Sequence, residues 1–85
     1  MQSFEYTITD AQGIHARPAG LLVKETAKYA SEIQLVFGEK SCDAKRLFGV
    51  MGMGIKCGDR ITVNIDGSDE KTAAAEIKKF FEQNL

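Results

Sequence analysis

The chain has 85 residues, of which 44% are hydrophobic and 27% charged, and its formal net charge is −1 at pH 7. A chain of this length has room for one core, so we expect a single domain over residues 1–85. The charge balance argues against a general nucleic-acid binder, which carries a clear basic excess. No segment approaches the roughly 20 apolar residues that span a bilayer, and no signal-peptide pattern is present, so the chain is expected in the cytosol.

The first third of the chain predicts a strand followed by a helix. Phe4, Tyr6 and Ile8 alternate with polar residues, which is typical of a half-buried strand, and residues 10–13 predict a turn. Apolar residues then recur at spacings of three and four, which predicts a helix that begins just after His15 and ends near Tyr29. Its buried face would consist of Ala19, Leu22, Val23, Ala27 and Ala30.

Two further strands follow, joined by a tight turn. Alternation over residues 32–37 predicts the second strand, and Gly38 is expected at positive φ in a two-residue hairpin turn to a third strand over residues 40–43. A short helix is predicted over residues 45–51. After a glycine-rich stretch and a turn at residues 58–59, Ile61, Val63 and Ile65 alternate with polar residues in a fourth strand.

The last segment predicts a helix capped by Ser68, with acidic residues in its first turn, where they favour the positive end of the helix dipole. Its apolar stripe comprises Ala74, Ile77 and Phe81, with Ala73 and Phe80 beside it. Strands and helices that are each apolar on one side bury those sides against each other. The order strand, helix, strand, strand, helix, strand, helix therefore predicts an α+β fold, a two-layer sandwich with one sheet face open to solvent.

The two cysteines, Cys42 and Cys57, fit no metal-binding spacing and are expected to be small hydrophobic fillers. His15 is the only histidine in the chain, with no second His or Cys nearby, so no metal site is expected.

The segment around His15 carries the chemistry. If His15 caps the first helix, Pro18 falls at the third helical position, where a missing N–H costs little. The free N–H groups of Ala16 and Arg17 would then point toward the imidazole and favour an anion there, and the forked guanidinium of Arg17 matches phosphate oxygens. This arrangement suits a phosphorylated imidazole. On the residues alone, a merely capping or surface histidine is an equal alternative.

Residues 13–19, Gly-Ile-His-Ala-Arg-Pro-Ala, closely resemble the active-site motif G-[LI]-H-x-R-P-A of the histidine-containing phosphocarrier (HPr) family. This family belongs to the bacterial phosphoenolpyruvate:sugar phosphotransferase system. The resemblance covers the whole chain, including its length, its order of elements, the Ala44-Lys45 step into the short helix and the segment from Gly49 to Ile55. A motif of this kind in this register is highly specific.

The resemblance implies that His15 is phosphorylated on Nδ1, as a pros-phosphohistidine, and that Arg17 interacts with the phosphoryl group. It implies a four-stranded antiparallel sheet covered on one face by three helices. The family accepts phosphate from enzyme I, charged by phosphoenolpyruvate, and donates it to sugar-specific IIA proteins or domains for sugar uptake. The protein would then be a carrier rather than a turnover enzyme, with no cofactor and no membrane insertion, and a monomer whose active surface is open.

Two helices would form the docking surface for these partners. One face of the first helix carries Arg17, Gly20, Leu21, Lys24 and Lys28. The short helix has more apolar residues than a helix of its length needs to bury. In the family both regions contact enzyme I and the IIA proteins, which assigns docking roles to Gly20, Lys24, Leu47, Phe48 and Met51. From the pattern alone, the charged residues could equally be a solvated face, and Leu47 or Met51 could complete the core.

One position departs from the family pattern. Many Gram-positive members carry a regulatory serine after the lysine that corresponds to Lys45, whereas this chain has Arg46. Arginine is no substrate for the serine kinase, so that switch is expected to be absent, and nothing transfers its role to Ser41. The fixed cation favours acidic partners. Two alternatives to a general carrier stay open: a regulatory protein of HPr type, and a small-molecule-binding module in which His15 is structural.

Overall fold

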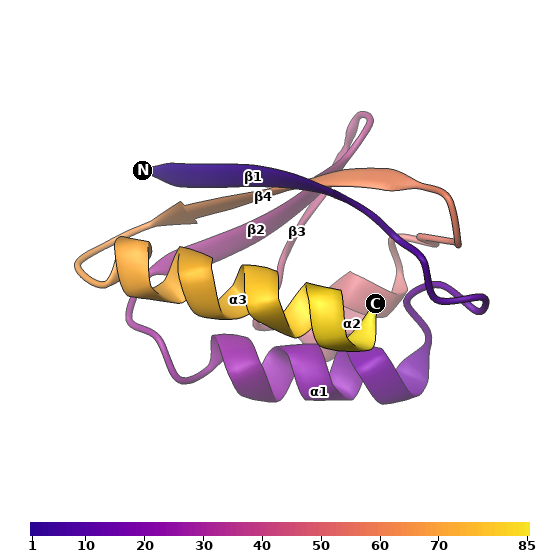
Figure 1. Cartoon of the computed structure of the whole chain (residues 1–85), viewed down its shortest axis with the longest axis horizontal. Helices are drawn as coiled ribbons and strands as arrows, with labels where there is room; N and C mark the ends of the chain where they lie inside the picture. The colour runs from indigo at the N-terminus through magenta and orange to yellow at the C-terminus, as the bar shows by residue number, and fades with distance from the viewer.

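A computed structural model describes all 85 residues and contains the seven predicted elements in the predicted order (Figure 1). They are β1 (Gln2–Thr7), α1 (Ala16–Thr26), β2 (Glu32–Phe37), β3 (Lys40–Asp43), α2 (Leu47–Met51), β4 (Arg60–Asp66) and α3 (Glu70–Asn84). The turn between β2 and β3 holds Gly38 at φ +60°, as predicted. No helix is both long and apolar enough to cross a membrane.

The four strands form one sheet in the order β1-β4-β2-β3, and each neighbouring pair is antiparallel. The register aligns one apolar row across the whole sheet. Phe4 lies opposite Val63, Val63 opposite Leu35, and Leu35 opposite Cys42. Because side chains alternate between the two faces of a strand, this row and the parallel rows two residues away point to the same side.

The three helices cover that apolar side, as Figure 1 shows, and enclose a core of 17 buried hydrophobic residues. Phe81 of α3 lies at one end of the core and is fully buried. Its ring centroid lies 5.9 Å from that of Phe4 and 5.4 Å from that of Tyr6, whose hydroxyl donates to the Phe81 carbonyl over 3.1 Å. Truncating such a side chain to alanine typically costs about 3–5 kcal/mol.

The opposite face of the sheet is polar and open, as predicted. Arg60 and Glu5 form an ion pair of 2.6 Å across β4 and β1, and the hydroxyl of Ser3 donates to the Asn64 side chain over 2.8 Å. These pairs lie in solvent, where each contributes little to stability. The fold is therefore the predicted α+β open-faced sandwich, with a four-stranded antiparallel sheet.

The first helix ends earlier than predicted. The regular helix α1 stops at Thr26, and the chain continues to Tyr29 in tighter turns, in which the N–H of Lys28 donates to Glu25 and that of Tyr29 to Thr26. Because these turns change the direction of the side chains, Ala27 and Ala30 are exposed rather than buried. Thr26 is fully buried in their place, and its hydroxyl donates to the carbonyls of Val23 and Ala44.

The starts of the other two helices also differ from the prediction. Helix α2 begins at Leu47 with Arg46 as its cap, two residues later than expected. Helix α3 is capped by Asp69, so the prediction of Ser68 was wrong. Asp69 is drawn to this position by hydrogen bonds to the α1–β2 loop, at Ala30 and Ser31, which are remote in sequence.

The cysteines are only partly the buried fillers that were predicted. Cys42 is half-buried beside the core, and burial raises the pKa of its thiol. Cys57 lies exposed in the β4 entry turn, so its assignment as a filler was wrong.

Candidate functional site

The loop before α1 is fixed by a close backbone approach at Gly13. Gly13 has φ +68°, and a Cβ atom there would lie 2.4 Å from the carbonyl oxygen of Ile55 and 2.6 Å from Cα of Lys56. Only glycine fits such a position without strain. The next residue, Ile14, is buried, and its N–H donates to the same Ile55 carbonyl over 3.0 Å. The first two residues of the motif thus fix the backbone that positions His15.

His15 is the N-cap of α1, as predicted, with φ −106° and ψ −171°. Its carbonyl accepts the first bond of the helix, from the N–H of Ala19, over 2.9 Å. The N–H groups of Ala16 and Arg17 donate to no acceptor within the protein, and Pro18 has no N–H. Two free donors at the positive end of an 11-residue helix therefore lie directly after the imidazole.

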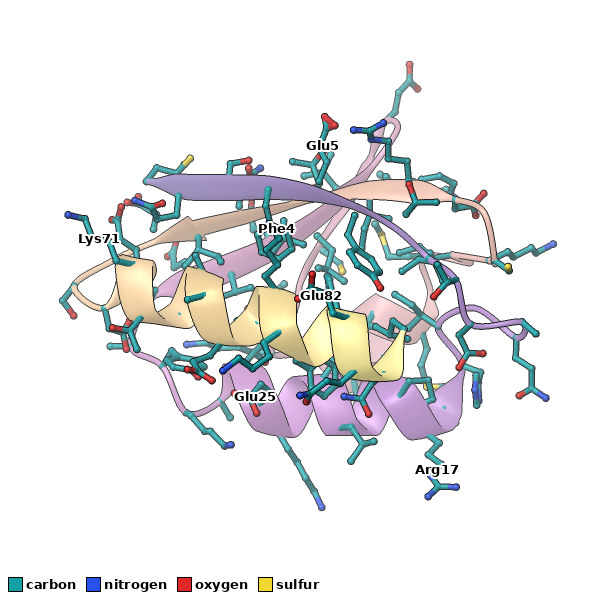
Figure 2. All side chains as sticks on the ribbon, viewed as in Figure 1. Phe4, Glu5, Arg17, Glu25, Lys71 and Glu82 are labelled. Carbon is teal, nitrogen blue, oxygen red and sulfur yellow. The ribbon has the colours of Figure 1, made fainter.

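The imidazole lies in a shallow, open hollow of about 320 Å³ at the N-terminal end of α1. Three elements supply its lining, which comprises Asp10, His15, Arg17, Pro18, Leu21 and Asn84. Figure 2 shows Arg17 at this end of α1, extending away from the sheet into solvent. His15 is itself half-buried and has no side-chain hydrogen bond. Its ring is therefore accessible and unengaged.

The hollow includes residues that the sequence did not single out. Asp10 comes from the β1–α1 turn, and Asn84 comes from the last turn of α3. Only the tertiary fold brings Asn84 to this place, because it lies 68 positions after Ala16, where α1 begins. Asp10 was within the predicted turn, and its proximity to His15 in sequence was the one available signal. Neither residue carries a recognisable motif.

Four large apolar side chains of α1 and α2 are exposed, and one of them, Leu21, also lines this hollow. The exposed fractions are 41% for Leu21, 37% for Leu47, 85% for Phe48 and 39% for Met51. Because α2 buries only Val50, Leu47 and Met51 do not complete the core. We call Leu21, Leu47, Phe48 and Met51 the α1–α2 apolar patch. Exposed apolar groups that gather in this way mark interaction surfaces.

Gly20 and Lys24 border the patch on α1. A Cβ atom built at Gly20 would meet nothing within 4 Å, so the fold itself does not require glycine there. Lys24 is exposed and forms no ion pair, whereas Lys28 pairs with Glu25 at 3.0 Å. The charge of Lys24 is thus not offset by an ion pair, whereas that of Lys28 is.

The relative placement of α1 and α2 is fixed by two polar side chains. The buried hydroxyl of Thr26 reaches the Ala44 carbonyl at 3.0 Å, and the Lys45 ammonium donates to the Tyr29 carbonyl at 2.7 Å. Both bonds join the end of α1 to the segment that leads into α2. The patch is consequently built on two elements that cannot shift freely against each other.

Arg46 lies at the start of α2 with its side chain 81% exposed. Its nearest anion is the carboxylate of Asp43 at 3.8 Å, a distance beyond ordinary hydrogen bonding. Such an exposed pair contributes little. Arg46 therefore presents a cation next to the α1–α2 apolar patch.

Comparison with known proteins agrees with this geometry. A family model described as the PTS HPr component phosphorylation site matches residues 2–83. The phosphocarrier protein HPr of Mycoplasma capricolum subsp. capricolum is 43% identical over 79 residues, which cover 93% of this chain and 89% of that relative.

Solved structures agree as well. The histidine-containing phosphocarrier protein of a Mycoplasma has a TM-score of 0.93 at 40% identity, covering 96% of this chain and 93% of that one. An HPr dimer from Thermoanaerobacter tengcongensis has a TM-score of 0.77 at 30% identity, covering 98% and 95%. The matched residues include the whole loop from Gly13 to His15, the start of α1 and the α1–α2 apolar patch. The chain belongs to the HPr family of phosphocarriers of the phosphotransferase system.

Proposed function

We propose that the chain accepts a phosphoryl group on Nδ1 of His15 from enzyme I and donates it to IIA proteins or domains that drive sugar uptake. The observation that carries this proposal is the pair of unpartnered N–H groups at Ala16 and Arg17, directly after an accessible histidine. A helix N-terminus with free donors favours a phosphate group. The Arg17 side chain adds a fixed positive charge at the same end of the helix.

The proposed reaction is a phosphoryl transfer between two proteins. The lone pair of Nδ1 attacks phosphorus, the N–P bond forms, and the bond between phosphorus and the donor group breaks. The negative charge on the three equatorial oxygens is then stabilised by the Ala16 and Arg17 N–H groups and by the guanidinium. In discharge, an acceptor group of the IIA protein attacks phosphorus, its bond to phosphorus forms, and the bond from phosphorus to Nδ1 breaks. The site must therefore hold the group without trapping it.

The α1–α2 apolar patch, together with Gly20 and Lys24, is the proposed contact surface for both partners. It shares helix α1 with the phosphoryl site, so that a partner seated on it reaches His15. A small surface with apolar residues and mobile methionine suits a carrier that binds different partners in turn and leaves each quickly. We propose that the carrier works in the cytosol as a monomer, because one copy holds the complete site.

A regulatory protein of HPr type is the second candidate, and Arg46 is the observation that favours it. Arg46 has no hydroxyl, so it cannot be phosphorylated by the serine kinase that acts on many Gram-positive members. Regulation at this position would have to act through a fixed cation. A phosphorylated chain that is never discharged by any IIA protein would support the regulatory candidate over the general carrier.

Phosphorylation by enzyme I tests the main proposal. Wild type and His15→Ala are incubated with phosphoenolpyruvate and a purified enzyme I, and the products are measured by intact mass. We expect one acid-labile phosphoryl group on the wild type and none on His15→Ala. Circular dichroism confirms that both proteins are folded, and a known carrier confirms that enzyme I is active. Under those conditions, an unmodified wild type contradicts the carrier function.

A further inference from the structure

We propose that Asp10 is an electrostatic positioning residue of the phosphoryl site, whose carboxylate promotes the discharge of phosphorylated His15. Asp10 acts through the charge and protonation of the imidazole and not by contact with a partner. The inference rests on the proposed phosphorylation of His15 and adds a residue to that site.

Three hydrogen bonds hold Asp10 in place, two through its backbone and one through its carboxylate. The Asp10 N–H donates to the Leu85 oxygen over 2.9 Å, and the Asp10 carbonyl accepts from the Gly13 N–H over 2.9 Å. Its Oδ1 accepts from the N–H of Gln12 over 2.9 Å. These bonds restrict both the backbone and the side-chain rotamer. One carboxylate oxygen is thereby engaged locally, and the charge stays at the edge of the hollow that contains His15.

Two fixed charges of opposite sign border this hollow. Asp10 contributes the anion from the β1–α1 turn, and Arg17 contributes the cation from α1. The residue from α3, Asn84, is neutral, and its side-chain amide donates to the Phe80 carbonyl over 3.0 Å. Neither Asp10 nor Arg17 forms an ion pair with any residue of the chain. Both charges are therefore available to act on a group placed between them.

The chemistry of discharge gives the carboxylate a defined effect. When the phosphoryl group leaves Nδ1, the P–N bond breaks and its electron pair returns to the ring. If Nε2 carries a proton, the leaving group is neutral imidazole, whereas an unprotonated ring would have to leave as imidazolate. A nearby carboxylate stabilises the protonated ring and repels the phosphoryl oxygens. Both effects favour transfer away from His15, while Arg17 and the free N–H groups favour retention.

The variant Asp10→Asn removes the charge and keeps an oxygen that accepts the Gln12 N–H. The matched control is Glu39→Gln in the β2–β3 turn, which removes the same charge at the hairpin tip, outside the hollow (Figure 1). Each protein is phosphorylated on Nδ1 and followed by ³¹P nuclear magnetic resonance. The rate of spontaneous hydrolysis and the rate of transfer to a IIA protein are measured as a function of pH.

For Asp10→Asn, we expect discharge of the phosphorylated protein near neutral pH to slow about threefold, both in hydrolysis and in transfer to the IIA protein. Glu39→Gln should match the wild type, and Asp10→Glu should recover part of the rate. An unchanged discharge rate in Asp10→Asn overturns the inference, as does an equal change in Glu39→Gln. Equal urea midpoints for unphosphorylated wild type and Asp10→Asn separate this effect from a loss of folding.

The source of the phosphoryl group distinguishes this inference from the proposed function. Phosphoramidate phosphorylates histidine without enzyme I, and the Nδ1 adduct is identified by its phosphorus signal. A wild type that is loaded by phosphoramidate but not by enzyme I would contradict the carrier function. The comparison of Asp10→Asn with Glu39→Gln would still decide the role of Asp10.

Discussion

Asp69 holds the α1–β2 loop against the start of α3 through three hydrogen bonds. Its carboxylate accepts from the N–H of Ala30 at 2.9 Å, from the N–H of Ser31 at 3.0 Å and from the Ser31 hydroxyl at 2.5 Å. The hydrogen bond from the Ser31 hydroxyl is the main cause that lowers the pKa of Asp69 below its ordinary value of 3.8, and the Ala30 N–H adds to it. The ionised form is thus favoured in the folded protein.

This lowered pKa predicts an acid-sensitive contribution to stability. A carboxyl group with a depressed pKa in the folded state stabilises the fold fully above its unfolded pKa, and this stabilisation is lost as the pH falls through the folded pKa. We expect Asp69→Asn to lower the free energy of unfolding at pH 7 and to differ less from the wild type at pH 3. Urea denaturation at both pH values measures the difference.

The exposed Glu82 of α3 provides the control for this measurement, because it forms no hydrogen bond or ion pair (Figure 2). Glu82→Gln should leave the pH dependence of stability close to that of the wild type. A destabilisation by Asp69→Asn of the same size at pH 3 and pH 7 would show that the carboxylate charge is not the source of the effect.

At the scale of the element, the start of α1 was predictable from sequence and its end was not. His15 and Pro18 constrain the backbone locally, and their effect is visible in a stretch of eight residues. The end of the helix depends on Thr26 and Lys45, whose bonds reach carbonyls on another segment. Those acceptors come near only after the chain has folded, so no spacing within α1 indicates them. For the same reason, the sequence did not indicate the role of Asp69 as a helix cap or the position of Asn84 in the hollow.

Gly20 gives the element-scale prediction, because helix stability and docking should respond in opposite directions. Alanine at this position meets no atom within 4 Å, so Gly20→Ala should raise the free energy of unfolding by about 0.5–1 kcal/mol. If the docking proposal is right, the added methyl group beside the site raises the KM for phosphoryl transfer from enzyme I. Urea denaturation and steady-state transfer rates provide the two readouts.

A suitable control for Gly20→Ala is a second stabilising change away from the docking surface, Thr72→Ala on α3. Thr72 is exposed and lies near the start of α3, away from α1's N-terminal end. It should stabilise the helix by a few tenths of a kcal/mol without changing the KM. A Gly20→Ala protein that is more stable and has an unchanged KM would remove Gly20 from the proposed docking surface.

The whole molecule has a net charge of −1, but its charged residues are distributed unevenly over the surface. The α1–α2 apolar patch is bordered by Arg17, Lys24 and Arg46, of which only Arg46 lies within 4 Å of a carboxylate. Such a basic rim raises the rate of association with acidic partners, and salt screens it. This distribution requires the tertiary structure, because the three cations come from two helices whose relative placement the sequence pattern did not specify.

Lys24→Gln tests this distribution. We expect the variant to lower kcat/KM for phosphoryl transfer about two- to threefold at low ionic strength, and the difference from wild type should shrink as salt is raised. Lys71→Gln removes the same charge in the first turn of α3, and Figure 2 shows Lys71 at the end of the molecule opposite to Arg17. Equal losses in both variants would indicate a net-charge effect rather than a local rim.

The order of the elements and the open-faced architecture were predictable because each strand and helix carries its apolar residues on one side. The strand order was not, since the pattern of each strand is compatible with several neighbours. In the structure, β1 pairs along its full length with β4, from Gln2 opposite Ile65 to Thr7 opposite Arg60.

That pairing has a consequence for synthesis on the ribosome. Strand β4 is a central strand of the sheet and also the sole partner of β1. A nascent chain that has not yet emerged past Asp66 therefore has no completed sheet, and its first strand has no neighbour. Because such distant contacts form late, the sheet should form in one step, only after β4 has emerged from the ribosome.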